Sequence, residues 1–230
     1  MASGKARKLP VVFPRACRLL KDIDDEGFRR LCECMGISEL RLRNKQTFIV
    51  ESDPCDRIGI VVTGAVRLTR QRIDGGRNVL ETIPENGVFG STYVFRDVPT
   101  MGISASAVGE TTVLLIEIAK LSHPCHKVCY AHMQFIRNLL AVMSQTTFAL
   151  KQKLRILSQR TIRARLMLFL NIRAKRAKSV EFDIPFDRQA LADYLCVDRS
   201  ALSAELSKLR KERKVESVKN RFKLLGVTMP

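Results

Sequence analysis

The amino-acid sequence predicts an α+β protein, in which an antiparallel β-domain is followed by a long helix and a winged helix-turn-helix. Three observations support this fold class. Short β-rich runs separated by turn residues fill the first half of the chain, apolar residues then recur at heptad spacing, and two short helical patterns joined by a tight turn stand near the C-terminus. A chain of 230 residues is long enough for two small domains, each with its own core.

Composition and charge limit the function. Hydrophobic residues make up 46% and charged residues 27%, as in ordinary globular proteins, and no apolar run approaches the roughly 20 residues that cross a bilayer. Pro10 and Pro14 interrupt the basic N-terminal segment, so we expect no secretory signal and a soluble, cytoplasmic protein. The net charge is +17, and residues 151–230 hold 20 basic but only 8 acidic residues. Such a segment suits DNA, RNA or an acidic membrane; the alternative is a well-solvated surface.

The first element is a predicted helix over Asp24–Met35, where Phe28 and Leu31 repeat at helical spacing after acidic starters. From Leu40 to about Ile118 the chain reads as many short strands, which predicts an antiparallel barrel, roll or sandwich. The β-rich runs are TFIV, RIGIVV, AVRLTR, NVLETI and TTVLLIEI, and the turn signals are SDP, TGA, DGG, PENG and VGE.

The next predicted element is a helix of more than thirty residues that follows Pro124. Its apolar positions alternate between steps of four and three residues, which forms a heptad seam. A seam of this length between a β-domain and a basic domain favours a parallel homodimer, although a helix packed on its own domain is the alternative. The predicted dimerisation residues are Ile136, Leu140, Met143, Thr147, Leu150, Leu154 and Leu157.

Three helices are predicted after this seam. The first covers Gln159–Ala174. The second is short: Asp187 is a good N-cap for it, and Leu191 and Leu195 lie on its inner face.

The third helix follows a tight turn. Asp198 is its predicted N-cap, and it runs from Arg199 to about Glu212. The length of the turn is typical of a helix-turn-helix. Beyond it, the runs KVESV and RFKLL on either side of Lys219-Asn220 predict a two-stranded wing.

The motif DRQALADYLCVDRSALSAELSKLRKE resembles the C-terminal helix-turn-helix of the Crp/Fnr transcription regulators. The segment RIGIVVTGAVRLTRQRIDGGRNVLETIPENGVFG is similar to that family's cyclic-nucleotide-binding-type β-roll. The resemblance covers almost the whole chain, and it implies a β-roll of the double-stranded β-helix or jelly-roll type. It also implies three parts: a sensor domain over residues 1–122, a dimerisation helix over 123–158 and a DNA-binding domain over 159–230.

The resemblance implies roles for single residues as well. The helix that starts at Arg199 would enter the major groove, where this arginine matches the position that reads a guanine through O6 and N7. Arg188 and Gln189 match positions that hold a phosphate, and Lys208 would add an electrostatic clamp. The implied DNA-binding residues are Arg188, Gln189, Arg199, Ser200, Ser203 and Lys208.

The chain departs from the family pattern in the helix that starts at Arg199, which we call the reader helix, and in the turn before it. Many members have Glu where Ser200 stands and Arg where Ala204 stands, so the family's usual DNA half-site is not expected here. Cys196 stands where the family usually has Gly. We interpret this thiol as a small buried hydrophobe.

The effector pocket is where the resemblance is weakest. Ser91 replaces the Glu that clamps the ribose, and Met101-Gly102 stand where an Arg-Ser pair holds the cyclic phosphate. Without that cation we do not expect cyclic AMP to bind. A small apolar or anionic ligand, or no ligand, stays open. The candidate pocket residues are Phe89, Gly90, Ser91 and Ser104.

A cluster of cysteines and histidines lies at the join between the β-domain and the long helix. All three histidines occur in SHPCHKVCYAHM, Ser122–Met133. If this segment is helical, Cys125, Cys129 and His132 share one face and could begin a zinc, iron or haem site. Ordinary packing and thiol redox sensing are the alternatives.

These features predict a sequence-specific DNA-binding transcription regulator that acts as a homodimer on two-fold half-sites. Its effector would be sensed in the β-roll or at the hinge, and RNA polymerase would be a partner if the protein activates transcription. The alternative is a cyclic-nucleotide-like sensor whose basic domain binds RNA or an acidic protein. The sequence shows no nucleophile–base pair or phosphate loop, so we expect no enzyme.

Overall fold

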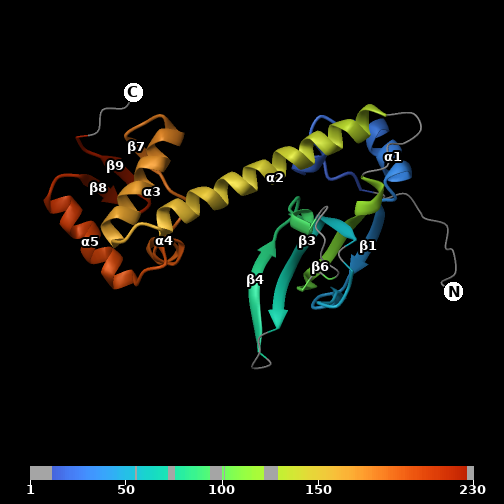
Figure 1. Cartoon of the computed structure of the whole chain (residues 1–230), viewed down its shortest axis with the longest axis horizontal. Coiled ribbons are helices and arrows are strands. Elements are labelled where there is room, and N and C mark those ends of the chain that lie inside the picture. Colours follow the sequence, from blue (N-terminus) through green and yellow to red (C-terminus); the bar gives the residue numbers. More distant parts are fainter. Residues whose placement is uncertain are drawn as a thin grey trace. The chain divides into compact units, whose positions relative to one another are not determined.

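The chain forms two compact units, Met1–Gln145 and Thr146–Pro230, and the boundary between them lies within helix α2 (Tyr130–Leu157) (Figure 1). The computed structural model describes residues 12–54, 56–71, 76–93, 100, 102–121 and 129–226. In this part of the chain, no helix has both the length and the apolar character that crossing a membrane requires.

The first unit is built on a six-stranded antiparallel sheet in the order β1-β6-β3-β4, with β2 paired to β6 and β5 paired to β3. The predicted β-roll is therefore confirmed. The strands are β1 (Ser38–Leu42), β2 (Thr47–Ile49), β3 (Arg57–Gln71), β4 (Arg77–Ile83), β5 (Val88–Phe89) and β6 (Ser104–Glu117). Short 3-10 helices are η1 (Arg18–Leu20), η2 (Ser91–Tyr93) and η3 (Ile118–Lys120).

The motifs TGA and VGE, which predict turns, instead lie inside the long strands β3 and β6. The two strands pair along their length, and the register shifts between Val61 and Ala65 as the chain passes through bulges. Gly64 and Gly109 both have φ of +76° there, and a Cβ on Gly64 would come within 2.5 Å of the Glu110 carbonyl oxygen. The prediction of turns was wrong because glycine marks a bulge as well as a turn.

The sheet has two apolar faces. Along β3, Ile58 and Ile60 belong to the cluster that also contains α1 (Asp25–Cys34) and the first turns of α2. Val61, which follows Ile60, belongs to the cluster inside the roll. Successive side chains of a strand point to opposite faces, so the strand supplies both cores.

Side-chain hydrogen bonds fix α1 and the first half of α2. The Asp24 side chain accepts a hydrogen bond from the Gly27 N–H at 2.7 Å, which caps α1. Asn138 of α2 donates to the carbonyl oxygens of Leu19 at 3.0 Å and Lys21 at 2.7 Å, which ties α2 to the segment before α1.

The second unit packs three helices on a small sheet in the order β7-β9-β8, drawn in orange and red in Figure 1. The observed helix starts and ends later than the predicted one over Gln159–Ala174. It starts later because the Thr161 hydroxyl accepts a hydrogen bond from the Ala164 N–H at 3.1 Å and caps the helix there. The elements are α3 (Ile162–Ala177), β7 (Glu181–Asp183), α4 (Arg188–Leu195), α5 (Arg199–Lys211), β8 (Val215–Val218) and β9 (Arg221–Leu224). The predicted helix-turn-helix and wing are confirmed.

Candidate nucleic-acid interface

Capping residues set the ends of α4 and α5. The Asp187 carboxylate accepts from the Ala190 N–H at 2.8 Å, as predicted. Asp198 stands at the N-cap of α5, but its side chain makes no capping hydrogen bond, so this prediction holds for the position alone. Cys196 ends α4 with φ of +53° and is exposed. The interpretation of Cys196 as a buried hydrophobe was wrong, because the left-handed cap that ends α4 leaves its side chain in solvent.

The apolar face of α5 decides which of its residues meet a partner. Leu202, Leu206 and Leu209 are buried in the core of the second unit. Arg199 and Ser200 are exposed, and Ser203 is half-buried. Among the residues the structure describes, Arg199 has no ion pair or hydrogen-bond partner for its side chain, so its five N–H donors are available to a ligand.

Arg188 and Gln189, the predicted phosphate ligands, have different surroundings. The Gln189 side chain is exposed and donates to Asp193 Oδ1 at 2.9 Å. The Arg188 guanidinium is half-buried and lies 5.8 Å from the centre of the Phe222 ring. Burial, and then the charge of Arg210, lower the pKa of Arg188.

Lys208 and Arg210 lie on different sides of α5. With 3.6 residues per turn, Lys208 is rotated by roughly 180° from Arg199, whereas Arg210 is rotated by roughly 20°. Both are exposed. The basic residue that shares the side of Arg199 is therefore Arg210, which the reading of the sequence missed. The spacing of eleven residues was the signal that could have found it.

Arg165 holds the turn between α4 and α5. Its Nη1 donates to the carbonyl oxygens of Leu195 at 3.3 Å and Cys196 at 3.4 Å, and its Nε donates to the Gln159 carbonyl at 3.0 Å. These carbonyls would otherwise have no intrahelical partner. One side chain from α3 thus joins the end of α4 to the segment that follows α2, and sequence reasoning missed this role.

A second ionic contact fixes the back of α5. Arg163 of α3 forms ion pairs with Glu205, at 3.4 Å, and with Glu212. Lys214 contacts Glu212 at 3.1 Å. The hydrogen bond from Arg163, reinforced by the one from Lys214, lowers the pKa of the Glu212 carboxyl to about 2. This side of α5 is therefore engaged with its own unit, which leaves the side of Arg199 for a partner.

The wing places more positive charge beside the helices. Lys219 and Asn220 form the exposed hairpin tip, where Lys219 has φ of +51°. Arg221 follows on β9 and pairs with Glu181 at 2.8 Å. Lys219 has no such acidic partner among the described residues.

The candidate effector residues are not brought together. Phe89 lies inside the roll, where its ring occupies the space that a Cβ on Gly59 would need. Gly90 and Ser91 follow it along the chain. Ser104 does not join them: its neighbour Ala105 points into the roll, and Ser104 lines a groove with Arg67 on the other face. The alternation of side chains along β6 is the reason.

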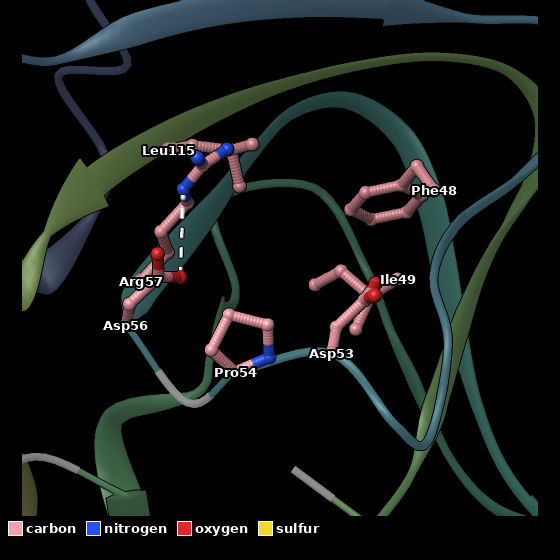
Figure 2. A pocket seen from close by; sticks show the side chains of 7 residues that line it. All are labelled: Phe48, Ile49, Asp53, Pro54, Asp56, Arg57 and Leu115. Atoms are coloured by element: carbon pink, nitrogen blue, oxygen red, sulfur yellow. Dashed lines mark ion pairs between the residues drawn. The ribbon is translucent and has the colours of Figure 1, made fainter. Parts of the chain in front are cut away.

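A cavity of about 270 Å³ lies at the edge of this core (Figure 2). Phe48 and Ile49 line it on one side, and Arg57 lies beside Asp56, with Nε and Oδ1 3.5 Å apart. Asp53 also lines it. Among the described residues that line it, the one cation is thus paired and there are two carboxylates, which is unfavourable for a cyclic phosphate.

The proposed metal cluster is only partly within the described residues, since Cys125 lies outside them. Cys129 precedes α2, and its carbonyl oxygen accepts from the N–H groups of His132 and Met133 at 3.1 and 3.3 Å. The cluster was predicted on the condition that residues 125–132 are helical; Cys129 stands one residue before the first helical residue, Tyr130. Among the described residues, no three His, Cys, Asp or Glu side chains could hold a metal ion.

Two N-terminal cysteines are buried in the first unit. Burial raises the pKa of Cys17, and burial together with the charge of Glu33 raises the pKa of Cys32 to about 11. A thiol with a raised pKa carries little thiolate at neutral pH, so these two side chains are poor nucleophiles and poor metal ligands.

The predicted dimerisation residues fall into two groups along α2. Ile136, Met143 and Leu157 are half-buried. Leu140, Leu150 and Leu154 are 62%, 61% and 68% exposed, and Thr147 is exposed as well. Met133, which is also exposed, stands one heptad before Leu140 and extends the seam towards the start of the helix.

The chain matches known proteins over both units. A family described as a cyclic nucleotide-binding domain matches residues 39–125, and one described as a Crp-like helix-turn-helix domain matches residues 164–228. The chain is 26% identical over 176 residues to the transcriptional activator protein FnrL of Cereibacter sphaeroides, over 73% of this chain and 68% of that protein.

Solved structures show the same fold. The catabolite activator protein of Thermus thermophilus aligns with a TM-score of 0.51 at 19% identity, covering 90% of this chain and 93% of that one. The c-di-GMP responsive global regulator CLP of Xanthomonas campestris aligns with a TM-score of 0.51 at 15% identity, covering 89% of this chain and 100% of that one.

Proposed function

We infer the function from one premise: this chain belongs to the Crp/Fnr family of transcription regulators, and its winged helix-turn-helix binds DNA. We propose that it binds as a homodimer, with two copies of α2 parallel along the heptad seam. A parallel pair presents two copies of α5 to one duplex, at half-sites one helical turn or about 34 Å apart.

The observation that carries the dimer is the exposure of the seam. Leu140, Leu150 and Leu154 stand at heptad positions of α2 and are more than half exposed in the single chain. Burying a leucine fully contributes about 1.5–3 kcal/mol, so a second copy of the same helix would gain from covering all three.

In this proposal Arg199 reads a guanine, since its guanidinium is exposed and has no acidic partner among the described residues. Ser200 and Ala204 add smaller contacts than the longer side chains common in the family, so the preferred sequence differs from the usual half-site. Contact with RNA polymerase, a cytoplasmic location and the sensing of an effector in the β-roll or at the hinge stay predictions.

Selection of bound sequences from random duplexes tests the proposal. The wild type should enrich a two-fold sequence with a guanine in each half-site. Arg199→Ala should lose that guanine, at a cost of about 1–3 kcal/mol in discrimination, while Arg176→Ala, which removes an exposed charge from the end of α3, should keep it. Added cyclic AMP should change neither affinity nor sequence. An unchanged guanine in Arg199→Ala would contradict the assignment.

A further inference from the structure

A groove of about 470 Å³ lies on the face of the sheet that points away from the interior of the roll. Strands β2, β3, β4 and β6 line it together with the turn between β1 and β2; β3, β4 and β6 lie side by side in Figure 1. Leu68 and Ala105 point into the roll, so the residues on either side of them along β3 and β6 point into the groove. The polar side chains that matter here are Lys45, Thr47, Arg67, Thr69, Ser104 and Ser106.

The strand register places Arg67 among hydroxyl-bearing residues. Arg67 of β3 is opposite Ser106 of β6 and Thr82 of β4. Ser106 is in turn opposite Thr47 of β2. Opposite residues of antiparallel strands have Cβ atoms about 4.5–5.5 Å apart. One arginine therefore stands in a row with three hydroxyl-bearing residues.

A second cation, Lys45, is held beside this row by the turn before β2. Its N–H donates to the Ala107 carbonyl at 2.9 Å, and the Ala107 N–H donates to the Gln46 carbonyl at 2.9 Å. Lys45 has φ of +64°, a left-handed backbone that lysine rarely adopts. The two hydrogen bonds to β6 maintain this conformation, so Lys45 stays next to the strand that carries Ser106.

The groove has positive charge without a compensating acid. Among the described residues, none that lines the groove is acidic, and neither Lys45 nor Arg67, both exposed, has an ion pair or a hydrogen bond to its side chain. The carboxylates of Glu51 and Asp53, close by along the chain, accept hydrogen bonds from backbone N–H groups. The formal charge of the described lining is therefore +2, which favours an anion.

The chemistry of the groove suits a phosphate group on a small molecule. A phosphate monoester carries a charge of about −1.5 to −2 at pH 7, which matches two cations better than the single charge of a carboxylate does. Arginine binds phosphate through two parallel hydrogen bonds, and serine and threonine hydroxyls can donate to the remaining oxygens. Val50 and Val79, 44% and 59% exposed, line the same groove and offer contact to an apolar part of the ligand. The volume is within the range of roughly 300–1,000 Å³ typical of small-molecule sites.

We propose that this groove binds a small phosphate ester. Arg67 and Lys45 bind the phosphate, and the hydroxyls of Ser104, Ser106 and Thr69 surround it. The site lies on the outside of the roll, so it does not depend on the residues that a cyclic nucleotide would need inside. The inference goes beyond the proposed function, and ligand binding is measured without DNA.

Calorimetric titration of the whole chain with phenyl phosphate tests the site. Phenyl phosphate joins a phosphate to an apolar ring, and benzoate carries a carboxylate on the same ring; we expect phenyl phosphate to bind more tightly. Arg67→Gln should weaken binding of phenyl phosphate at least tenfold. Lys45→Asn should weaken it as well, and asparagine tolerates the left-handed backbone. Arg29→Gln, which removes an exposed charge from α1, should keep the wild-type affinity. The Tm of each variant without ligand should equal that of the wild type, because all three positions are exposed.

Four outcomes would overturn the site. The first is the same affinity in Arg67→Gln and Arg29→Gln, whether unchanged or equally weakened, since the groove would then have no special role. The second is binding of benzoate as tight as that of phenyl phosphate, which would assign a carboxylate ligand. The third is loss of the dimer in Arg67→Gln, which would mean that a second copy of the chain covers the groove. The fourth is the absence of phenyl phosphate binding by a wild type that still selects its DNA sequence; the proposed function would then stand without this site.

Discussion

His132 is a polar residue that is buried in the core of the first unit. It is 3% exposed, and in the described part of the chain neither ring nitrogen has a hydrogen-bond partner. A buried polar group left without a partner destabilises a fold by about 1–3 kcal/mol. It is the third residue of α2, and its N–H donates to the Cys129 carbonyl oxygen at 3.1 Å, so its state bears on how the long helix begins.

We expect His132→Met to raise the free energy of unfolding by about 1 kcal/mol, because methionine fills a similar volume and has no strong donor or acceptor to satisfy. Thermal and urea unfolding of both proteins measure this. His132→Gln is the control, since it keeps polar atoms in the same place and should bring no gain. A loss of stability in His132→Met would mean that a ring nitrogen has a valuable partner, and metal analysis of the wild type would then identify a bound ion.

Helix α3 positions the reader helix α5 through two arginine side chains on the side away from Arg199. Arg165 joins the end of α4 to the Gln159 carbonyl, and Arg163 joins α3 to Glu205 and Glu212 of the α5 region. Both arginines lie near the start of α3, which begins directly after the segment that follows α2. Any movement of that segment therefore acts on two contacts that fix the turn and the back of α5.

Arg165→Met should lower the free energy of unfolding of the second unit by about 2 kcal/mol, because the charged donor is lost from partly buried carbonyl oxygens while the aliphatic volume stays. Affinity for DNA should fall, and the selected sequence should stay the same, because Arg165 positions the turn and does not contact bases. Unfolding curves and DNA titrations check both. Arg160→Met, on an exposed residue of the same segment, is the matched control. Equal behaviour of the two variants would contradict this role for Arg165.

The elements also show what the sequence can and cannot predict. Helix caps are local, so Asp187 could be identified as an N-cap and Asp24 as the start of a helix, and the heptad spacing predicted α2 without knowledge of its contacts. Bulges depend on the pairing of distant strands, so Gly64 and Gly109 were interpreted as turns. The Arg163–Glu205 ion pair brings together residues 42 positions apart, and no local pattern links them.

For the whole molecule, the heptad seam decides whether two readers can act on one duplex. Residues 144–151 of α2 are exposed on every side of the helix in the single chain. The seam crosses this stretch through Thr147 and Leu150, so pairing here would join the two copies between their sensor and reader units.

Leu150→Asp should convert the dimer to a monomer at micromolar concentration, because it places a carboxylate at the centre of an apolar seam. Affinity for the two-fold DNA should fall at least tenfold. Ala149→Asp puts the same charge on an exposed position about 100° around α2 from Leu150 and outside the seam, so this variant should remain dimeric. Analytical ultracentrifugation and DNA titration measure both effects. A monomeric wild type, or a dimeric Leu150→Asp, would contradict pairing through this seam.

The exposure of residues 144–151 affects the stiffness of α2. Isolated helices shorter than about 12–15 residues are only marginally stable in water, and the described part of the chain leaves residues 144–151 exposed. In the proposed dimer, the part of α2 that joins the two units would then be only as stiff as the pairing that covers it. Dilution that separates the two copies would make this part of α2 more flexible before either unit unfolds. The concentration of the protein in the cell would then set how strongly a change in one unit affects the other.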